Sequence, residues 1–405
     1  MKIEEYKQIK KIALLVSCAS VLQMVEYLFP QPLPGVKLGL ANMITLVTLV
    51  NLGFSAAVEV AVLRTIISSF ILGTFLSPTF ILSFSSALVS TLIMGLFYKL
   101  STFNSKMYLS LIGISLLGAI TNNLVQIGLV YLLLIRHKGV FLLLPWLGIS
   151  AVITGWLTGF IASEVCKKLE TSTDKISLPQ NTSSQNIYKD GTLLKNSFSL
   201  GRYISIDSPV HRVAPYIKII TVLVLSLIVL ISNNFLVYAT ILLLLLGAVH
   251  RAKIPFLNLL SDIKKTYSLI FISFLVPVLF NKNGEILLSL GMFNITKEGL
   301  VMGSMFVFRI VLMMTSAFLL LKTTSPDELT NDLKKLLVPL RIIGISGERM
   351  AEIITLSLTS IPILMEKSHS FIREQKFNKK VFRDFFPAIV GLIVVLYQQS
   401  DEQII

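Results

Sequence analysis

The chain has 405 residues, of which 54% are hydrophobic and only 14% charged, and its formal net charge is +14. Its mean hydropathy of +0.78 excludes an ordinary water-soluble domain, because water could not wet such a surface. Apolar runs of about 20 residues recur, and each can cross about 30 Å of hydrocarbon. The sequence therefore predicts an all-α polytopic membrane protein. The basic residues flank the apolar runs, which favours membrane topology over nucleic-acid binding.

Six apolar spans are predicted in residues 1–170, which we call the first module. They cover roughly 12–29, 38–52, 54–74, 79–99, 108–134 and 143–165. If the N-terminus is cytoplasmic, only Lys37, Arg136 and Lys138 among the flanking basic residues face outward, which supports that orientation and a cytoplasmic (inner) membrane. Cys18 follows a lysine-rich leader, as in a lipoprotein signal. The apolar run before it, about six residues, is shorter than the roughly 7–15 of such signals, so we expect an uncleaved span.

A polar linker and a second membrane module follow. Residues 171–200 are rich in Ser, Thr, Asn and Lys, which is typical of a linker because such a segment buries little apolar surface. In the second module, residues 201–405, apolar spans are predicted near 215–233, 235–250, 267–280 and 298–321. The charged, amphipathic stretch at about 322–380 predicts long helices at the cytoplasmic surface. The last apolar run, 385–397, is compatible with a span or with packing along that surface.

Polar side chains inside the predicted spans of the first module are candidates for a binding site. A charge within the membrane costs at least ~2.5–3.5 kcal/mol on insertion scales, so Arg64 needs a partner or a function. Lys37 and Arg64 would meet an anionic group, and four amides would supply directional hydrogen bonds: Asn42, Asn122, Asn123 and Gln126. In the alternative interpretation the amides bond across helices, Lys37 extends to the interface, and Glu59 is the ion partner of Arg64.

Two stretches and one arginine of the first module carry a family resemblance. GVKLGLAN at 35–42, Arg64 and GAITNNLVQ at 118–126 resemble the family labelled heptaprenyl diphosphate synthase component I, also called Gx transporters, over residues 10–168. That family is similar to the substrate-binding (S) components of energy-coupling-factor transporters. The resemblance implies a six-helix bundle that captures a vitamin-like molecule, such as a flavin. It also implies that the small residues Ala13 and Ser17 contact the coupling subunit.

The second module is similar to the transmembrane coupling (T) component of the same transporters. The matching stretches are YISIDSPVHRVAPYIK at 203–218, TTSPDELTNDLKKLLVPLR at 323–341 and Ser-Ile-Pro at 360–362. The resemblance implies that charged helices dock on two ATP-binding-cassette ATPases, which use ATP and tip the S component over in the membrane.

The sequence departs from the T-component pattern at the ATPase contacts. Members of that family carry two Ala-Arg-Gly-like motifs. Here residues 377–379 stand where the first would be, and the second would follow residue 405. The candidate ATPase contacts that remain are Arg373, Lys376 and Lys379, and lysine lacks the planar fork of arginine.

Catalytic patterns are missing from the sequence. It has no DDxxD motif for magnesium diphosphate, no Walker A motif, and no metal or Ser/His/Asp pattern around its four histidines. We therefore expect a transport protein without catalytic residues, bound metal or covalent cofactor, which uses ATP only indirectly. It would bind a small-molecule substrate, the lipid bilayer and the ATPases, but no nucleic acid. The alternatives are a non-transporting docking or assembly protein and an accessory subunit of isoprenoid (heptaprenyl diphosphate) synthesis.

Overall fold

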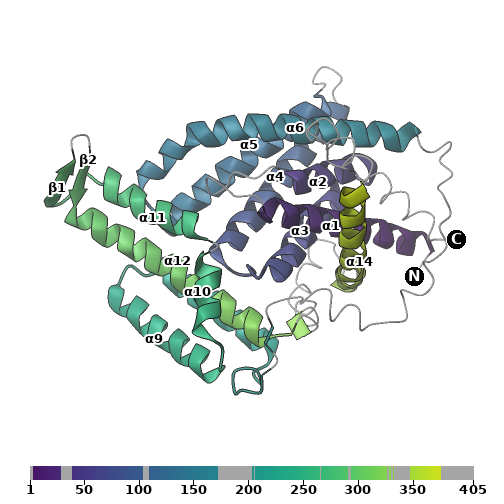
Figure 1. The fold of residues 1–405 in the computed structure, drawn as a ribbon. Coiled ribbons are helices and arrows are strands. Elements are labelled where there is room, and N and C mark those ends of the chain that lie inside the picture. The colour runs from purple at the N-terminus through teal and green to yellow at the C-terminus, as the bar shows by residue number, and fades with distance from the viewer. Residues whose placement is uncertain are drawn as a thin grey trace.

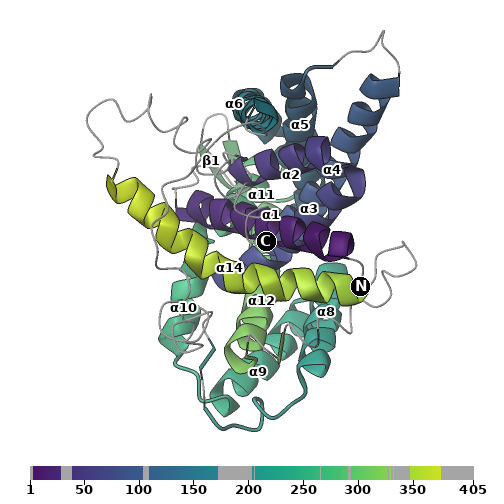
Figure 2. The ribbon, with the colours of Figure 1, turned by 90° about the vertical axis from the view of Figure 1, so that its right-hand side faces the viewer.

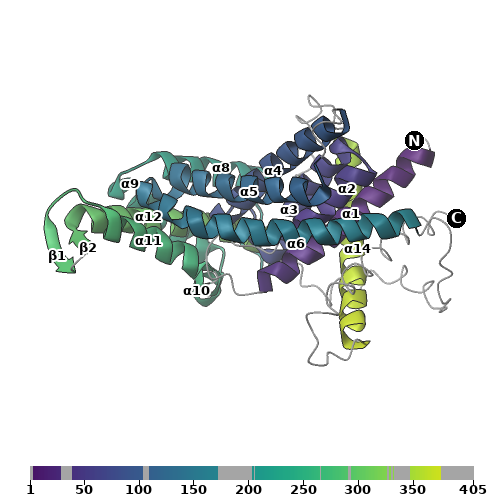
Figure 3. The same ribbon diagram turned by 90° about the horizontal axis from the view of Figure 1, so that it is seen from above.

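The computed structural model describes residues 3–28, 39–103, 109–171, 203–204, 206–264, 266–290, 293–325, 328–329, 332 and 347–374. Within these ranges the chain is almost entirely helical, and its one two-stranded hairpin lies at the end of the molecule opposite α14 (Figures 1 and 3). Among the described residues, five helices are long and apolar enough to cross a membrane. The all-α polytopic fold predicted from the sequence is confirmed.

The helices of the first module follow the predicted spans closely. They are α1 (Ile3–Leu28), α2 (Leu40–Asn51), α3 (Phe54–Leu72), α4 (Pro78–Phe103), α5 (Leu111–Leu129) and α6 (Leu144–Thr171). A π-helical turn, η2 (Val130–Ile135), continues α5, and a 3₁₀ turn, η3 (Lys138–Leu143), leads into α6. The first helix begins well before the predicted residue 12. Its early part is helical although lysines interrupt the apolar run there.

Small residues let α5 and α6 approach closely. A Cβ added at Gly159 would lie 2.7 Å from the Cα of Ile112, and one at Gly155 would lie 2.9 Å from the Cα of Leu116. The two glycines are four residues apart on α6 and therefore lie on one face. This is the small-xxx-small packing of membrane helices, which depends on backbone contact.

The described part of the second module contains the four predicted apolar helices, together with one short helix and a two-stranded hairpin that were not predicted. Its helices are α8 (Pro215–Ile231), α9 (Phe235–Arg251), α10 (Phe256–Lys264), α11 (Tyr267–Phe280), α12 (Lys297–Thr323) and α14 (Gly347–Glu374). The short helix α10 lies between the predicted spans near 235–250 and 267–280. Strands β1 (Ile286–Leu290) and β2 (Phe293–Thr296) form an antiparallel hairpin. Strands of five and four residues are too short to give a clear alternation of apolar and polar residues in the sequence.

The outer face of α6 is apolar. Large side chains exposed along it include Trp146, Ile149, Ile153, Trp156 and Phe160. Their spacing of three and four residues places them on one stripe of the helix. A stripe of this size would be unstable in water and is suited to lipid. The chain is therefore a multi-pass membrane protein.

Apolar packing joins the two modules. One buried cluster combines residues of α1, α2 and α3 with Ile353, Ile354 and Ile361 of α14. Another combines Leu134 and Ile135 of η2 with residues of α8, α9, α11 and α12. Helix α14 crosses α1 (Figure 2). The buried core is thus continuous across the boundary that the polar linker marks in the sequence.

Candidate functional site

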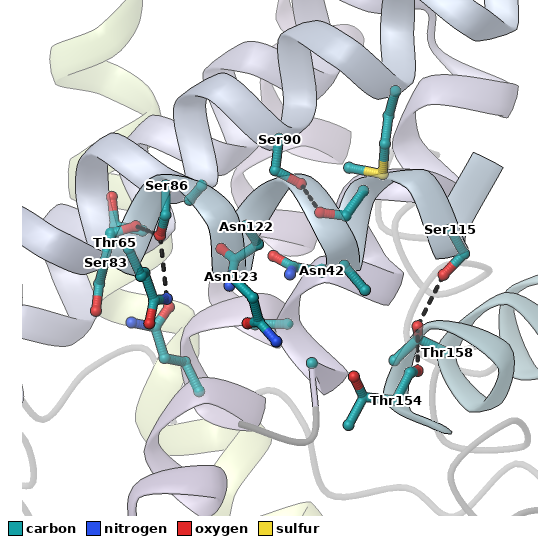
Figure 4. Close-up of a pocket in the computed structure, with 18 of the residues that line it drawn as sticks. Asn42, Thr65, Ser83, Ser86, Ser90, Ser115, Asn122, Asn123, Thr154 and Thr158 are labelled. Carbon is teal, nitrogen blue, oxygen red and sulfur yellow. Dashed lines mark hydrogen bonds between the residues drawn. The ribbon is translucent and has the colours of Figure 1, made fainter. Parts of the chain in front are cut away.

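A polar cavity lies inside the first module, between side chains of all six of its helices (Figure 4). Of its 20 lining residues, 14 have polar side chains and none is aromatic. Its volume is about 50 Å³, which holds only a few water molecules, because one water needs about 10–15 Å³. A vitamin-sized molecule would therefore require the helices around it to move apart.

Arg64 of α3 is the buried cation of this cavity. It is only 4% exposed. Its guanidinium donates to Asn42 Oδ1 of α2 at 2.5 Å and to Gln23 Oε1 of α1 at 3.1 Å. Its Nε is buried and has no hydrogen-bond partner in the described part of the chain. The arginine thus joins three helices, and these two bonds use only two of its five N–H donors, the Nε–H not among them.

Glu26 of α1 supplies the negative charge of the same cavity. Its carboxylate accepts the backbone N–H of Leu40, the first residue of α2. A carboxylate is favourable there, since the first N–H groups of a helix lack partners and carry the positive end of its dipole. Gly39, just before the helix, has a φ of 78°, which glycine adopts without strain. Glu26 therefore fixes the start of α2 close to Arg64.

The three amides of α5 differ in how they are bonded. The side-chain N–H₂ of Asn123 donates to the carbonyl oxygen of Leu147 at 2.8 Å and to Ser150 Oγ at 3.2 Å, both on α6. That of Gln126 donates to Ser86 Oγ of α4 at 3.2 Å. Asn122 also lines the cavity and makes no hydrogen bond within the described residues. Two of these amides therefore link helices, and the third remains available.

Most hydroxyl groups of the cavity donate their hydrogen to a backbone carbonyl. Ser90 Oγ donates to the carbonyl of Gly118 at 2.8 Å, across α4 and α5. Other hydroxyls donate within their own helices: Thr65, Ser86, Thr154 and Thr158. Each oxygen then keeps lone pairs that can accept a further bond.

The structure brings together most of the residues proposed for substrate binding. Asn42, Arg64, Asn122, Asn123 and Gln126 all line the cavity. Lys37 lies outside the described residues. The same is true of Lys376 and Lys379, and of the side chain of Arg373 in the last turn of α14. No group of His, Cys, Asp or Glu that could hold a metal occurs in the described ranges.

Glu59 does not pair with Arg64, which corrects the alternative considered from the sequence. Its carboxylate lies 3.4 Å from a guanidinium nitrogen of Arg349 on α14. The Glu59 side chain is 4% exposed and the Arg349 side chain 22% exposed. Proximity in sequence suggested the pairing with Arg64. Glu59 and Arg64 both lie on α3, but Glu59 faces α14 of the second module.

Helices α1 and α14 meet at the two small residues proposed as a contact. Ser17 Oγ donates to the carbonyl oxygen of Ala13 at 2.7 Å and lies 3.1 Å from that of Ser357 on α14. In return, Ser357 Oγ donates to the carbonyl oxygen of Ala13 at 2.9 Å. All three side chains are buried. Close approach of the two helices depends on small side chains at this crossing.

A second contact between the modules centres on Arg309 of α12, which sequence reasoning missed. The side chain is fully buried. It donates to the carbonyl oxygens of Leu133 and Leu134 in η2 at 3.2 Å each, and to that of Ser232, which ends α8, at 3.1 Å. The hydroxyl of Tyr238 lies 3.1 Å away. An arginine inside an apolar span was the signal that identified Arg64, and it would have identified this residue too.

Comparisons with known proteins separate the two modules. Residues 15–165 match the family model described as "Heptaprenyl diphosphate synthase component I", and residues 207–376 match "Cobalt transport protein". Several relatives carry the name "Energy-coupling factor transporter transmembrane protein EcfT". The relative from Listeria innocua is 37% identical over 203 residues, which cover 49% of this chain and 77% of the length of that relative. Those from Bacillus subtilis and Streptococcus thermophilus are 31% and 32% identical over half of this chain, 79% and 80% of their own lengths.

Proposed function

Because the chain belongs, through its second module, to the family of energy-coupling factor transporter transmembrane proteins, we propose that it combines substrate capture with coupling to ATP-binding-cassette ATPases. Its first module would capture a small vitamin-like molecule, with a flavin among the candidates, and its second would transmit movement from the ATPases. The protein would lie in the inner membrane, with its N-terminus in the cytoplasm. ATP would be hydrolysed by the separate ATPase subunits.

The observation that supports this proposal most is the contact of α14 with the helices of the cavity. Helix α14 bonds to α1 through Ser357 and to α3 through Arg349. Helices α1 and α3 also carry Gln23 and Arg64 of the cavity. Movement of α14 would therefore act directly on two walls of the cavity. The stretch from Arg373 to Lys379, which continues from α14, is where we propose the ATPase contact.

The test is co-purification and ATP hydrolysis. The full chain would be expressed with energy-coupling-factor ATPases from the same cell, purified through a tag on this chain, and placed in lipid nanodiscs. We expect the ATPases to co-purify and substrate to change their ATP hydrolysis rate. Arg349→Ala should reduce that response, whereas Arg251→Ala, an exposed basic residue at the end of α9, should not.

The departure from an Ala-Arg-Gly-like motif at residues 377–379 favours a second candidate, a docking or assembly protein without transport. In that case no ATPase would co-purify, and Arg64→Leu would leave every activity unchanged, because Arg64 would only join helices. A role in isoprenoid synthesis is suggested by the description of the first family model alone. It predicts a faster chain-extension rate when this protein is added to a prenyl synthase.

A further inference from the structure

The hydrogen-bonding groups of the cavity are not balanced between donors and acceptors. The hydroxyl hydrogens of Ser90, Thr154 and Thr158 are bonded to backbone carbonyls, at 2.7–2.8 Å. The oxygens of these groups still accept, since a hydroxyl has one hydrogen and two lone pairs, although Ser115 at 2.8 Å already occupies one lone pair of Thr158. A bound molecule would therefore meet these residues as acceptors.

The amides of α5 also offer more free acceptors than free donors. The N–H₂ groups of Asn123 and Gln126 donate to α6 and α4, respectively. Within the described residues, no hydrogen bond engages the carbonyl oxygens of these two side chains. Asn122 offers both an oxygen and an N–H₂ group, because its side chain has no partner in the described ranges. Acceptors thus outnumber donors along this wall, which suits a ligand with several O–H or N–H groups.

The charges of the cavity cancel. Its described lining contains one cation, Arg64, and one carboxylate, Glu26. Glu26 is also bonded to the start of α2, and Arg64 to Gln23 and Asn42. An anionic ligand would face Glu26 in a buried site, where unbalanced charge is costly. The Nε–H of Arg64 can donate to a neutral oxygen as well as to an anion.

We propose that this cavity takes a neutral small molecule that carries several hydroxyl or N–H donors, and that it selects against the corresponding anion. The inference rests on the substrate-capture role proposed above. It differs from the expectation drawn from Lys37 and Arg64, which pointed to an anionic group. The difference arises because the structure brings Glu26 and the bonded hydroxyls to the same cavity.

The experiment compares three fluorescent flavin probes against the full chain in lipid nanodiscs, with empty nanodiscs as background. Riboflavin is neutral and carries a hydroxylated chain, flavin mononucleotide adds an anionic phosphate, and riboflavin 5′-acetate adds bulk without charge. We expect riboflavin and its acetate to bind at least about tenfold more tightly than the mononucleotide. Asn122→Leu should weaken riboflavin about 3- to 10-fold, the effect of one hydrogen bond. Thr240→Val, on the exposed face of α9, should change nothing.

Equal or tighter binding of the mononucleotide would overturn the proposal, and so would an Asn122→Leu variant with unchanged affinities. If no flavin binds, the molecules released from the purified protein by denaturation would be identified by mass spectrometry. A neutral, polyhydroxylated compound supports the proposal. A carboxylate or phosphate compound, or no compound at all, overturns it. Association with ATPases is measured separately, so failure here leaves the proposed coupling function intact.

Discussion

Replacing Arg309 by leucine should loosen the attachment between the two modules. The guanidinium is fully buried and donates to three backbone carbonyls at the ends of η2 and α8, at 3.1–3.2 Å. The last carbonyls of a helix have no partner within it, and a cation there is favourable. Leucine would leave the buried oxygens of Leu133 and Leu134 without this donor, whereas the oxygen of Ser232 keeps the hydroxyl of Tyr238 at 2.6 Å.

The expected cost is about 2 kcal/mol, taking about 1 kcal/mol for each of the two acceptors that lose their donor. At about 2–4 °C per kcal/mol, the melting temperature should fall by about 4–8 °C. Differential scanning fluorimetry of the purified protein measures this shift. Arg309→Lys should be intermediate, because lysine keeps the charge but lacks the fork. Arg212→Ala, whose ion pair with Asp207 is exposed, serves as the control with no measurable change.

A second readout tests whether Arg309 joins the modules or merely stabilises one of them. A protease site would be inserted in residues 171–200, and the purified chain cut there. The wild-type halves should stay together on size exclusion, whereas those of Arg309→Leu should separate. Unchanged melting together with joined halves would refute the reasoning.

Three further predictions concern α3, α6 and the turn before η3. Glu59→Gln and Arg349→Gln should show a coupling energy of about 1 kcal/mol in a double-mutant cycle, modest because Arg349 is partly exposed; strict additivity would contradict it. Gly159→Ala should destabilise by about 1–3 kcal/mol, because its Cβ would meet the Ile112 backbone at 2.7 Å, whereas Gly148→Ala on the same helix has open space and should melt as wild type. Burial lowers the pKa of His137, so stability should fall as pH drops below 6.5, and His137→Asn should flatten that profile.

The helices were predictable because their signal is local. Each apolar run in the first module became a helix within a few residues of its predicted ends, apart from the start of α1. The cavity was partly predictable too, since Arg64 and the amides of α5 are conspicuous in apolar segments. Their partners were not. Glu26 and Gln23 lie on another helix, and nothing in the local sequence shows that Glu26 caps α2.

The partners in the contacts between the modules could not be predicted from the local sequence either. The spacing of Ala13 and Ser17 suggested a contact surface, but not that Ser357 would bond to both. The pairing of Glu59 with Arg349 joins residues 290 positions apart. Such pairs depend on the tertiary arrangement of α1, α3 and α14, which no periodicity in either segment encodes.

The two modules are attached in two separate regions: around Arg309 at η2, and along α14, through Ser357 at α1 and Arg349 at α3. Attachment in two separate regions resists pulling the modules apart and leaves rotation about the line that joins the regions as the least hindered movement. Displacement of α14 with both attachments kept would therefore turn the first module about that line. The cavity within the first module would then be carried along without either module detaching from the other.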